Sequence, residues 1–205
     1  MTMDFSFFNT NKVVPVVVLS SIDETIPKLS ALKRGGINVA EITFRTSCAP
    51  DCLALAVKTF PDMLVGVGTI INREQCVKAL DLGAKFVVSP GFSKEVAEEC
   101  ISRDVPYIPG VITPTEVMMA KAVGLNVLKF FPASDFGGIK TMKALSAAFP
   151  DVRFVPTGGV GESNLHEFLE QKFVLGAGGS WMMKGTESDI ETASRRAVEI
   201  AKEYI

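Results

Sequence analysis

The sequence predicts an α/β protein built as a (β/α)8 barrel, or TIM barrel, with a short N-terminal helical segment closing the bottom of the barrel. Three observations support this prediction: short apolar runs rich in β-branched residues recur, an amphipathic stretch follows each run, and the repeat is roughly 20–25 residues long. An open doubly wound sheet would carry a GxGxxG motif after the first strand, but the first run leads into Ser20-Ser21 instead. We therefore expect one barrel domain spanning residues 1–205.

The expected strands share a length of five to seven residues and a high content of apolar side chains. They cover residues 13–19, 39–44, 63–68, 85–89, 105–109, 126–131, 152–156 and 173–178. Residues 1–12 precede the first strand and contain Phe5, Phe7 and Phe8. We expect these residues to form the short helix below the barrel.

Capping residues predict where several of the intervening helices begin. The expected caps are Ser21-x-x-Glu24, Asn72-x-x-Gln75, Thr113-Pro114-Thr115-Glu116 and Ser188-x-x-Glu191. The first helix is expected to bury Ile22, Ile26, Leu29 and Leu32 on one face and to end before Gly35-Gly36, and Gly83 is expected to end the helix that Asn72 opens.

Composition excludes several classes of function. The net charge is −2 with basic and acidic residues interspersed, so we expect no nucleic-acid partner. No apolar run reaches the length of a membrane span and the first residues do not resemble a signal peptide, so we expect a cytoplasmic protein without membrane contact. The cysteines Cys48, Cys52, Cys76 and Cys100 lack metal-ligand spacing and are expected to be reduced thiols. The single histidine, His166, is expected to be exposed, and we expect neither a metal nor a cofactor.

The candidate chemistry centres on Lys129, the one charge in an apolar strand. Burial is one way in which enzymes obtain a neutral, nucleophilic lysine. The strand period places Glu41, Thr43 and Arg45 on one face, and active sites of such barrels lie at the C-terminal strand ends. Two interpretations of Lys129 and Glu41 therefore remain: a structural ion pair, or a reactive amine beside a proton carrier. Arg45 likewise forms either a salt bridge to Glu41 at the rim of the barrel or a binding site for a substrate carboxylate.

Glycine-rich segments follow the last two expected strands. Gly158-Gly159 and Gly178-Gly179-Ser180 lie where this fold usually binds phosphate, because bare backbone N–H groups can approach an anion there. Tight turns are the alternative explanation. Gly137-Gly138 is a further possible donor segment.

Several segments resemble one enzyme family in the same order along nearly the whole chain. They are Val13-Val14-Pro15-Val16, Glu41-Ile42-Thr43-Phe44-Arg45-Thr46, Gly66-Val67-Gly68-Thr69, Val88-Ser89-Pro90-Gly91, Pro109-Gly110-Val111-Ile112-Thr113-Pro114-Thr115-Glu116, Leu128-Lys129-Phe130-Phe131-Pro132-Ala133, Pro156-Thr157-Gly158-Gly159 and Gly179-Ser180-Trp181. The sequence thereby resembles the 2-keto-3-deoxy-6-phosphogluconate (KDPG)/4-hydroxy-2-oxoglutarate (KHG) aldolase family.

The resemblance implies a trimeric class I aldolase without a metal, in which Lys129 is the Schiff-base lysine and Glu41 transfers protons. It further implies roles for eight other residues: the pyruvate carboxylate would be held by Arg45 and Thr69, the pyruvyl pocket walled by Pro90 and Phe131, and the phosphate held by Gly158, Gly159, Gly179 and Ser180. Ser134 is a departure, since many relatives carry glutamate there.

The expected reaction is cleavage of KDPG to pyruvate and glyceraldehyde 3-phosphate. The alternatives are a preference for KHG or for 2-keto-3-deoxy-6-phosphogalactonate, a non-covalent phosphosugar isomerase or epimerase that uses Glu41 as base, and a non-catalytic sugar-phosphate sensor.

Overall fold

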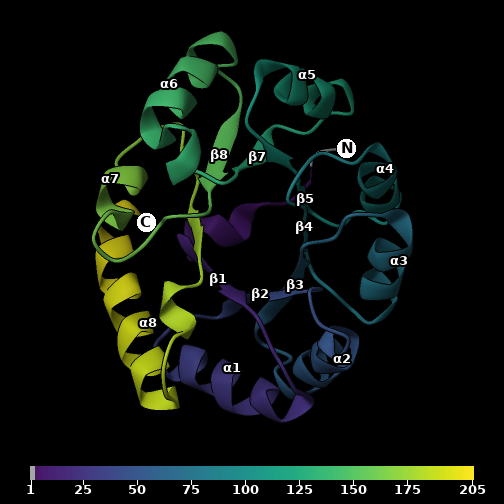
Figure 1. Ribbon diagram of the computed structural model, residues 1–205, viewed down its shortest axis with the longest axis vertical. Helices are drawn as coiled ribbons and strands as arrows, with labels where there is room; N and C mark the ends of the chain where they lie inside the picture. Colours follow the sequence, from purple (N-terminus) through teal and green to yellow (C-terminus); the bar gives the residue numbers. More distant parts are fainter. Residues whose placement is uncertain (1–2) are drawn as a thin grey trace.

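Parallel strands form the centre of the computed structural model, which describes residues 3–205, and helices surround them (Figure 1). The strands are short and buried along most of their length. In chain order they are β1 (Val13–Val17), β2 (Val39–Thr43), β3 (Leu64–Gly68), β4 (Val87–Val88), β5 (Tyr107–Ile108), β6 (Gly110–Val111), β7 (Val127–Phe130), β8 (Arg153–Pro156) and β9 (Ala177–Gly179).

The strands close into a barrel. Two hydrogen-bonded sheets, β5-β4-β3-β2-β1-β9 and β6-β7-β8, are joined at one side by parallel bridges from Phe154 to Val174 and from Thr157 to Gly178. At the other side Pro109 separates β5 from β6, because a proline has no N–H to continue the hydrogen-bonded ladder. The predicted (β/α)8 barrel is confirmed, and its predicted fifth strand is split in two.

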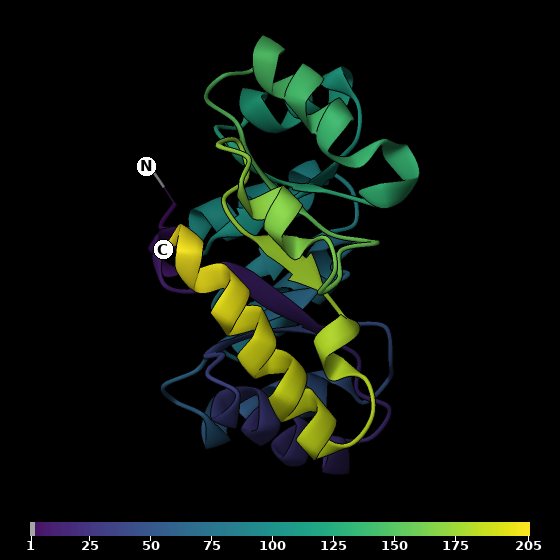
Figure 2. The same cartoon turned by 90° about the vertical axis from the view of Figure 1, so that its left-hand side faces the viewer.

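Helices follow the strands and cover the outside of the barrel (Figures 1 and 2). The α-helices are α1 (Thr25–Arg34), α2 (Ala49–Thr59), α3 (Arg73–Asp81), α4 (Lys94–Ser102), α5 (Pro114–Ala122), α6 (Gly138–Ala148), α7 (Leu165–Leu169) and α8 (Glu187–Ala201). Short 3-10 helices are η1 (Ser6–Asn9), η2 (Ile22–Glu24), η3 (Ser134–Phe136), η4 (Trp181–Met183) and η5 (Lys202–Tyr204).

Two of the four predicted helix caps are confirmed. The Asn72 side chain accepts from the N–H of Gln75 at the start of α3. Thr113 and Glu116 form a complete capping box at the start of α5, with Pro114 in the first turn. Side-chain acceptors at these positions satisfy N–H groups that a helix leaves without partners.

The predicted starts of the first and last helices are wrong. Ser21 makes no side-chain cap, and the 3-10 helix η2 precedes α1. Thr186, not Ser188, caps α8 through a capping box with Asp189. Both segments fit the same Ser/Thr-x-x-acid pattern, and the structure selects the one that directly follows Gly185, whose φ is +84°.

The predicted apolar face of the first helix is only half correct. Leu29 and Leu32 are fully buried, whereas Ile22 and Ile26 are each 42% exposed. Ile22 lies in η2, outside the α-helix, and within α1 the buried stripe is formed by Thr25, Leu29 and Leu32 at i, i+4 and i+7, so Ile26 falls beside it.

Strand ends also differ from the expected ranges. β1 ends at Val17, β4 consists of Val87 and Val88, and β9 covers Ala177–Gly179. Before β9, Val174 contributes only an isolated bridge to Phe154.

The bottom of the barrel is closed as predicted. η1 places Phe8 inside, where it is fully buried, and Phe7 stacks on both Phe8 and Phe86. The purple N-terminal turn is seen near the middle of the barrel in Figure 1. Residues 1 and 2 of the expected segment lie outside the described residues.

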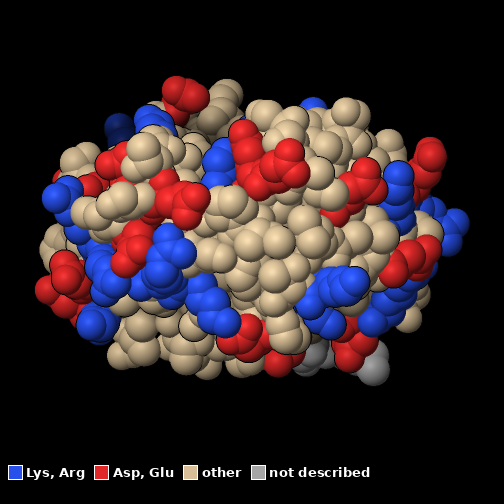
Figure 3. All heavy atoms as spheres, turned by 90° about the horizontal axis from the view of Figure 1, so that it is seen from below, with Lys and Arg blue, Asp and Glu red and all other residues tan. Residues whose placement is uncertain are grey.

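The described surface agrees with the expected charge pattern. On the face shown in Figure 3, Lys and Arg are interspersed with Asp and Glu, and neither sign dominates. Within residues 3–205, no helix combines the length and apolar character needed to cross a bilayer. The cysteines Cys48, Cys52, Cys76 and Cys100 are free thiols.

Candidate active site

Glu41 in β2 and Lys129 in β7 face each other inside the barrel. Glu41 is 3% exposed and Lys129 is 4% exposed, and the Lys129 Nζ lies 3.8 Å from the Glu41 Oε1. The two strands are not neighbours in the sheet, so the pair spans the barrel interior as the alternation of side chains predicted.

The cost of burying the Glu41 carboxylate is only partly offset by interactions with its neighbours. Its Oε1 has no hydrogen-bond partner within residues 3–205. Burial raises the pKa of the Glu41 carboxyl, and the nearby charges of Lys129 and then Arg45 oppose this effect only in part. A carboxyl whose pKa is raised in this way holds a proton more readily than an exposed glutamate does, as a proton-transfer residue requires.

Gly68, at the end of β3, determines where the Glu41 side chain can lie. A Cβ atom added to Gly68 would stand 1.8 Å from Glu41 Oε1 and 2.5 Å from its carboxyl carbon. The missing side chain at this position therefore provides the space that the Glu41 carboxyl occupies.

Lys129 lies between β6 and β8, opposite Gly110 on one side and Val155 on the other. Its Nζ is 5.0 Å from the centre of the Phe131 ring. Gly110 in turn approaches the backbone of Pro90 closely, since a Cβ on Gly110 would stand 2.1 Å from the Pro90 carbonyl oxygen. The expected pocket residues Pro90 and Phe131 thus lie in the immediate surroundings of the lysine.

Arg45 and Thr69 meet at the rim. Arg45 lies just beyond β2, is exposed, and donates from Nε to Thr69 Oγ1 over 3.0 Å. Thr69 has φ +60°, a left-handed conformation that residues other than glycine rarely adopt. This backbone conformation places the Thr69 hydroxyl beside the guanidinium. Thr43, by contrast, is fully buried and its hydroxyl donates to the Val17 carbonyl.

One polar residue at the site was missed by sequence reasoning. Thr157 follows β8, is 6% exposed, and lines the same interior cavity as Glu41 and Lys129. A Cβ on Gly178 would stand 2.4 Å from its Oγ1, so a bare glycine accommodates it. The signal in the sequence was its place in Pro156-Thr157-Gly158-Gly159, where the glycines alone had been considered.

The loop after β8 has the features of an anion-binding loop. Gly158 and Gly159 have φ of +91° and +77°, so both adopt backbone conformations that favour glycine. Their carbonyl oxygens are already engaged: Gly158 accepts from the Ser134 N–H and Gly159 from the Asn164 side chain. Within residues 3–205 their own N–H groups donate to no protein acceptor, which leaves them available to an anion.

The loop after β9 lies beside it. The Thr157 to Gly178 bridge joins the two loops at their bases. Gly179 ends β9 and Ser180 precedes the short helix η4, which matches the usual phosphate region of this fold. The described geometry therefore brings Gly158, Gly159, Gly179 and Ser180 to the same end of the barrel.

His166 and the possible metal ligands do not join this site. His166 is 54% exposed and contacts Glu170 and Tyr204 on the outer surface. Within the described part of the chain, no group of three or more His, Cys, Asp or Glu side chains is placed to hold a metal.

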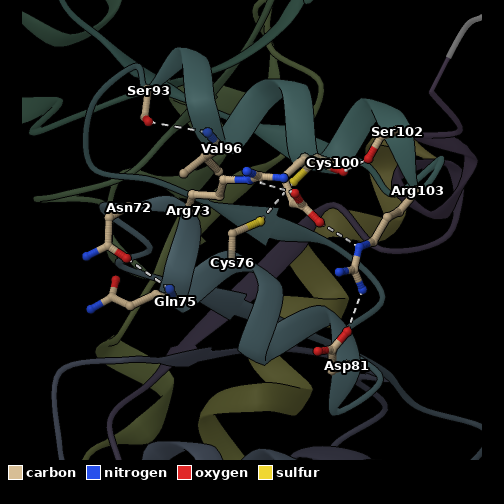
Figure 4. Close-up of polar contacts among 11 residues, drawn as sticks. Asn72, Arg73, Gln75, Cys76, Asp81, Ser93, Val96, Cys100, Ser102 and Arg103 are labelled. Atoms are coloured by element: carbon tan, nitrogen blue, oxygen red, sulfur yellow. Dashed lines mark hydrogen bonds and ion pairs between the residues drawn. The ribbon is translucent and has the colours of Figure 1, made fainter.

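A separate polar cluster lies between α3 and α4 (Figure 4). Glu99, 6% exposed, accepts from Arg73 over 2.9 Å and from Arg103 over 2.8 Å, and Arg103 also pairs with Asp81. The Arg73 hydrogen bond, followed by that of Arg103, lowers the pKa of Glu99 despite its burial.

Beside this cluster the thiols of Cys76 and Cys100 are 3.5 Å apart. Hydrogen bonding from Cys100 lowers the pKa of Cys76, and the same contact together with burial raises the pKa of Cys100.

Comparisons with known proteins agree with this arrangement. The family model described as "Aldolase: KDPG and KHG aldolase" matches residues 6–197. The Escherichia coli (strain K12) protein named KHG/KDPG aldolase is 38% identical over 203 residues, covering 96% of this chain and 95% of the relative.

Two solved structures are similar over nearly their full length. The KDPG aldolase of Legionella pneumophila, with pyruvate captured as a covalent carbinolamine, is 38% identical with a TM-score of 0.86, covering 96% of this chain and 95% of that one. The enzyme of Zymomonas mobilis ZM4, with 3-phosphoglycerate, is 33% identical with a TM-score of 0.90, covering 95% and 94%.

Proposed function

The chain belongs to the KDPG and KHG aldolase family, and we propose that it cleaves KDPG to pyruvate and glyceraldehyde 3-phosphate through an imine on Lys129. The observation that carries the proposal is the buried pair of Lys129 and Glu41, 3.8 Å apart inside the barrel. An amine beside a carboxyl of raised pKa is the combination that class I aldol chemistry needs.

The two ends of the substrate bind to different loops. Arg45 and Thr69, already hydrogen-bonded to each other, offer donors to the C1 carboxylate. Gly158, Gly159, Gly179 and Ser180 offer donors to the C6 phosphate. Pro90 and Phe131 wall the pyruvyl part. Holding both ends fixes the C3–C4 bond over Lys129, which lowers the entropic part of the barrier.

The first chemical step forms the imine. The neutral amine of Lys129 attacks the C2 carbonyl carbon, the C=O π electrons move onto oxygen, and one proton passes from the nitrogen to that oxygen, which gives a carbinolamine. Glu41, through a water, then protonates this hydroxyl so that it leaves as water and an iminium remains. The covalent carbinolamine captured in the Legionella pneumophila relative supports this step.

The second step breaks the carbon–carbon bond. Glu41, now ionised, takes the C4 hydroxyl proton through its water, the C3–C4 electron pair moves into the iminium, and glyceraldehyde 3-phosphate leaves with C4 as its aldehyde carbon. Glu41 or its water then protonates C3 of the enamine. Hydrolysis of the new iminium frees pyruvate and regenerates the Lys129 amine.

KHG is the second candidate substrate, because the Escherichia coli relative carries both names. The test compares kcat/KM for KDPG, its galactonate epimer and KHG in an assay that measures pyruvate. We expect KDPG to give the highest value, and both phosphorylated acids to exceed KHG, since only they reach the glycine loops. An equal or higher value for KHG would contradict the proposed substrate and the phosphate role of Gly158 and Gly159.

A non-covalent isomerase or epimerase would bind sugar phosphates without an imine. Borohydride treatment in the presence of pyruvate separates these possibilities by intact mass. We expect one reduced pyruvyl adduct per chain, whereas an unchanged mass would favour the non-covalent reaction. A sugar-phosphate sensor would bind KDPG and release no pyruvate.

We further propose that the enzyme is a cytoplasmic homotrimer and needs no metal or cofactor, as the family resemblance implies. Light scattering should give about three times the 22.0 kDa chain mass. Extensive treatment with EDTA should leave the pyruvate assay unchanged, and a loss that added metal restores would contradict this proposal.

A further inference from the structure

We propose that the Ser134 hydroxyl is an additional donor to the distal phosphate and a determinant of the preference for phosphorylated substrate. This inference rests on the proposed function, because it concerns the same reaction and the same anion-binding loop.

Ser134 is fixed against the loop after β8 by backbone hydrogen bonds. The Ala133 N–H donates to the Thr157 carbonyl over 2.9 Å, and the Ser134 N–H donates to the Gly158 carbonyl over 3.0 Å. These bonds join the segment after β7 to the proposed phosphate loop. The position of the Ser134 α-carbon relative to Gly158 and Gly159 is therefore set by the backbone.

The side chain of Ser134 lies directly over Gly159. A Cβ atom on Gly159 would stand 2.0 Å from Ser134 Oγ and 2.4 Å from Ser134 Cβ. The Ser134 hydroxyl thus occupies the space that a side chain at position 159 would fill. An anion that accepts from the Gly159 N–H lies within reach of that hydroxyl.

The hydroxyl is free to act as a donor. Ser134 is exposed, and its Oγ makes no hydrogen bond to any of residues 3–205. The Gly158 carbonyl accepts from the Ser134 N–H, and the Gly159 carbonyl accepts from the Asn164 side chain. The Ser134 hydroxyl is therefore available to donate a hydrogen bond to a phosphate oxygen.

The chemistry of the candidate substrates makes this contact selective. In KDPG the phosphate is attached at C6, two carbons beyond the C4 hydroxyl. In KHG the second carboxylate is attached to C4 itself, so it ends well short of the loop. A donor at Ser134 therefore stabilises the bound phosphorylated acid and leaves the shorter acid unaffected.

The experiment measures kcat/KM of Ser134→Ala for KDPG and for KHG, with Ser188→Ala, an exposed serine of α8, as the matched control. A hydrogen bond to a charged group is worth enough that its loss should lower kcat/KM for KDPG about tenfold. The value for KHG should stay within about twofold of wild type. Ser134→Thr, which keeps the hydroxyl, should retain most of the KDPG activity.

The proposal is overturned if Ser134→Ala keeps the wild-type ratio of the two kcat/KM values, or if Ser134→Thr loses as much as Ser134→Ala. Inorganic phosphate as an inhibitor of KHG cleavage gives a second readout, since Ser134→Ala should weaken that inhibition in parallel. Failure of the proposed function is distinguishable, because wild-type protein would then cleave neither substrate or would favour KHG.

Discussion

Glu41 in β2 and Glu99 in α4 are both buried glutamates, yet the protein treats their charges in opposite ways. Glu99 accepts hydrogen bonds from two arginines, and its pKa is lowered. Glu41 faces one lysine at 3.8 Å, keeps one carboxyl oxygen without a partner, and has its pKa raised. The same side chain is thus held as a fixed anion between two helices and, inside the barrel, as the carboxyl of raised pKa that we propose carries protons.

The difference shows what separates a structural ion pair from a reactive one. Burial disfavours the ionised form of both carboxyls; nearby positive charges oppose that cost in each case, but only Glu99 also accepts hydrogen bonds from its arginines. Arg73 and Arg103 provide such donors to Glu99, while the bare Gly68 beside Glu41 provides space and no donor. A proton carrier requires this incomplete solvation, which a structural pair avoids.

Replacing Lys129 should have the largest effect on activity. Lys129→Met removes the amine that forms the imine, so we expect pyruvate release to fall on the order of 10⁴–10⁶-fold. Circular dichroism should show an intact fold, because methionine fills a similar volume in the barrel. Activity within tenfold of wild type would exclude Lys129 as the nucleophile.

The matched pair Glu41→Gln and Glu99→Gln makes the same chemical change in both regions. We expect kcat of Glu41→Gln to fall about 10²–10⁴-fold, the usual contribution of a general acid–base residue. Steady-state kinetics of Glu99→Gln should match wild type. Equal losses in the two variants would mean that Glu41 acts through stability alone.

The pH dependence of kcat should report the raised pKa of Glu41. Because its ionised form must accept a proton, activity should decline as the pH falls through a midpoint above the usual glutamate value of about 4.3. This acid limb should persist in Glu99→Gln and be absent from the residual activity of Glu41→Gln. If wild type, Glu99→Gln and Glu41→Gln all showed the same acid limb, the titrating group would be a residue other than Glu41.

The smallest effect is expected for the stability of Glu99→Gln. The pKa of Glu99 is lower folded than unfolded, so its contribution is present above the unfolded value and lost as the pH falls through the folded one. We expect a Tm about 2–4 °C below wild type at neutral pH, shrinking in acid. A Tm deficit that grew as the pH fell would contradict this sign.

The same linkage gives Glu41 the opposite sign. Its folded pKa lies above the unfolded value, so its favourable contribution is present below the unfolded value and lost as the pH rises through the folded one. The proton carrier therefore lowers stability at the pH where it is ionised.

Much of the fold followed from local patterns in the sequence. The recurring apolar runs and the caps at Asn72 and Thr113 predicted the barrel because each depends on nearby residues alone. The break between β5 and β6 at Pro109 was not predicted. A proline interrupts a strand only where the adjacent strand would accept a hydrogen bond from the N–H that proline lacks, and the sequence alone does not show this. The choice of Thr186 over Ser188 depends on the backbone at Gly185.

The candidate site divides in the same way. Alternation along β2 and β7 was sufficient to predict that Glu41 and Lys129 face inward. The hydrogen bond from Arg45 to Thr69 depends on the left-handed backbone conformation of Thr69, which no local sequence pattern predicted. Thr157 enters the cavity because Gly178 leaves room for it, a contact between two strands that adjacent residues do not encode.

The most direct test of the account is the site of the reduced pyruvate adduct. Wild-type protein is treated with pyruvate and borohydride, digested, and the modified peptide sequenced by mass spectrometry. The account predicts a single modification on Lys129, formed more slowly in Glu41→Gln and at the wild-type rate in Glu99→Gln. Modification of a different lysine, or none, would contradict it.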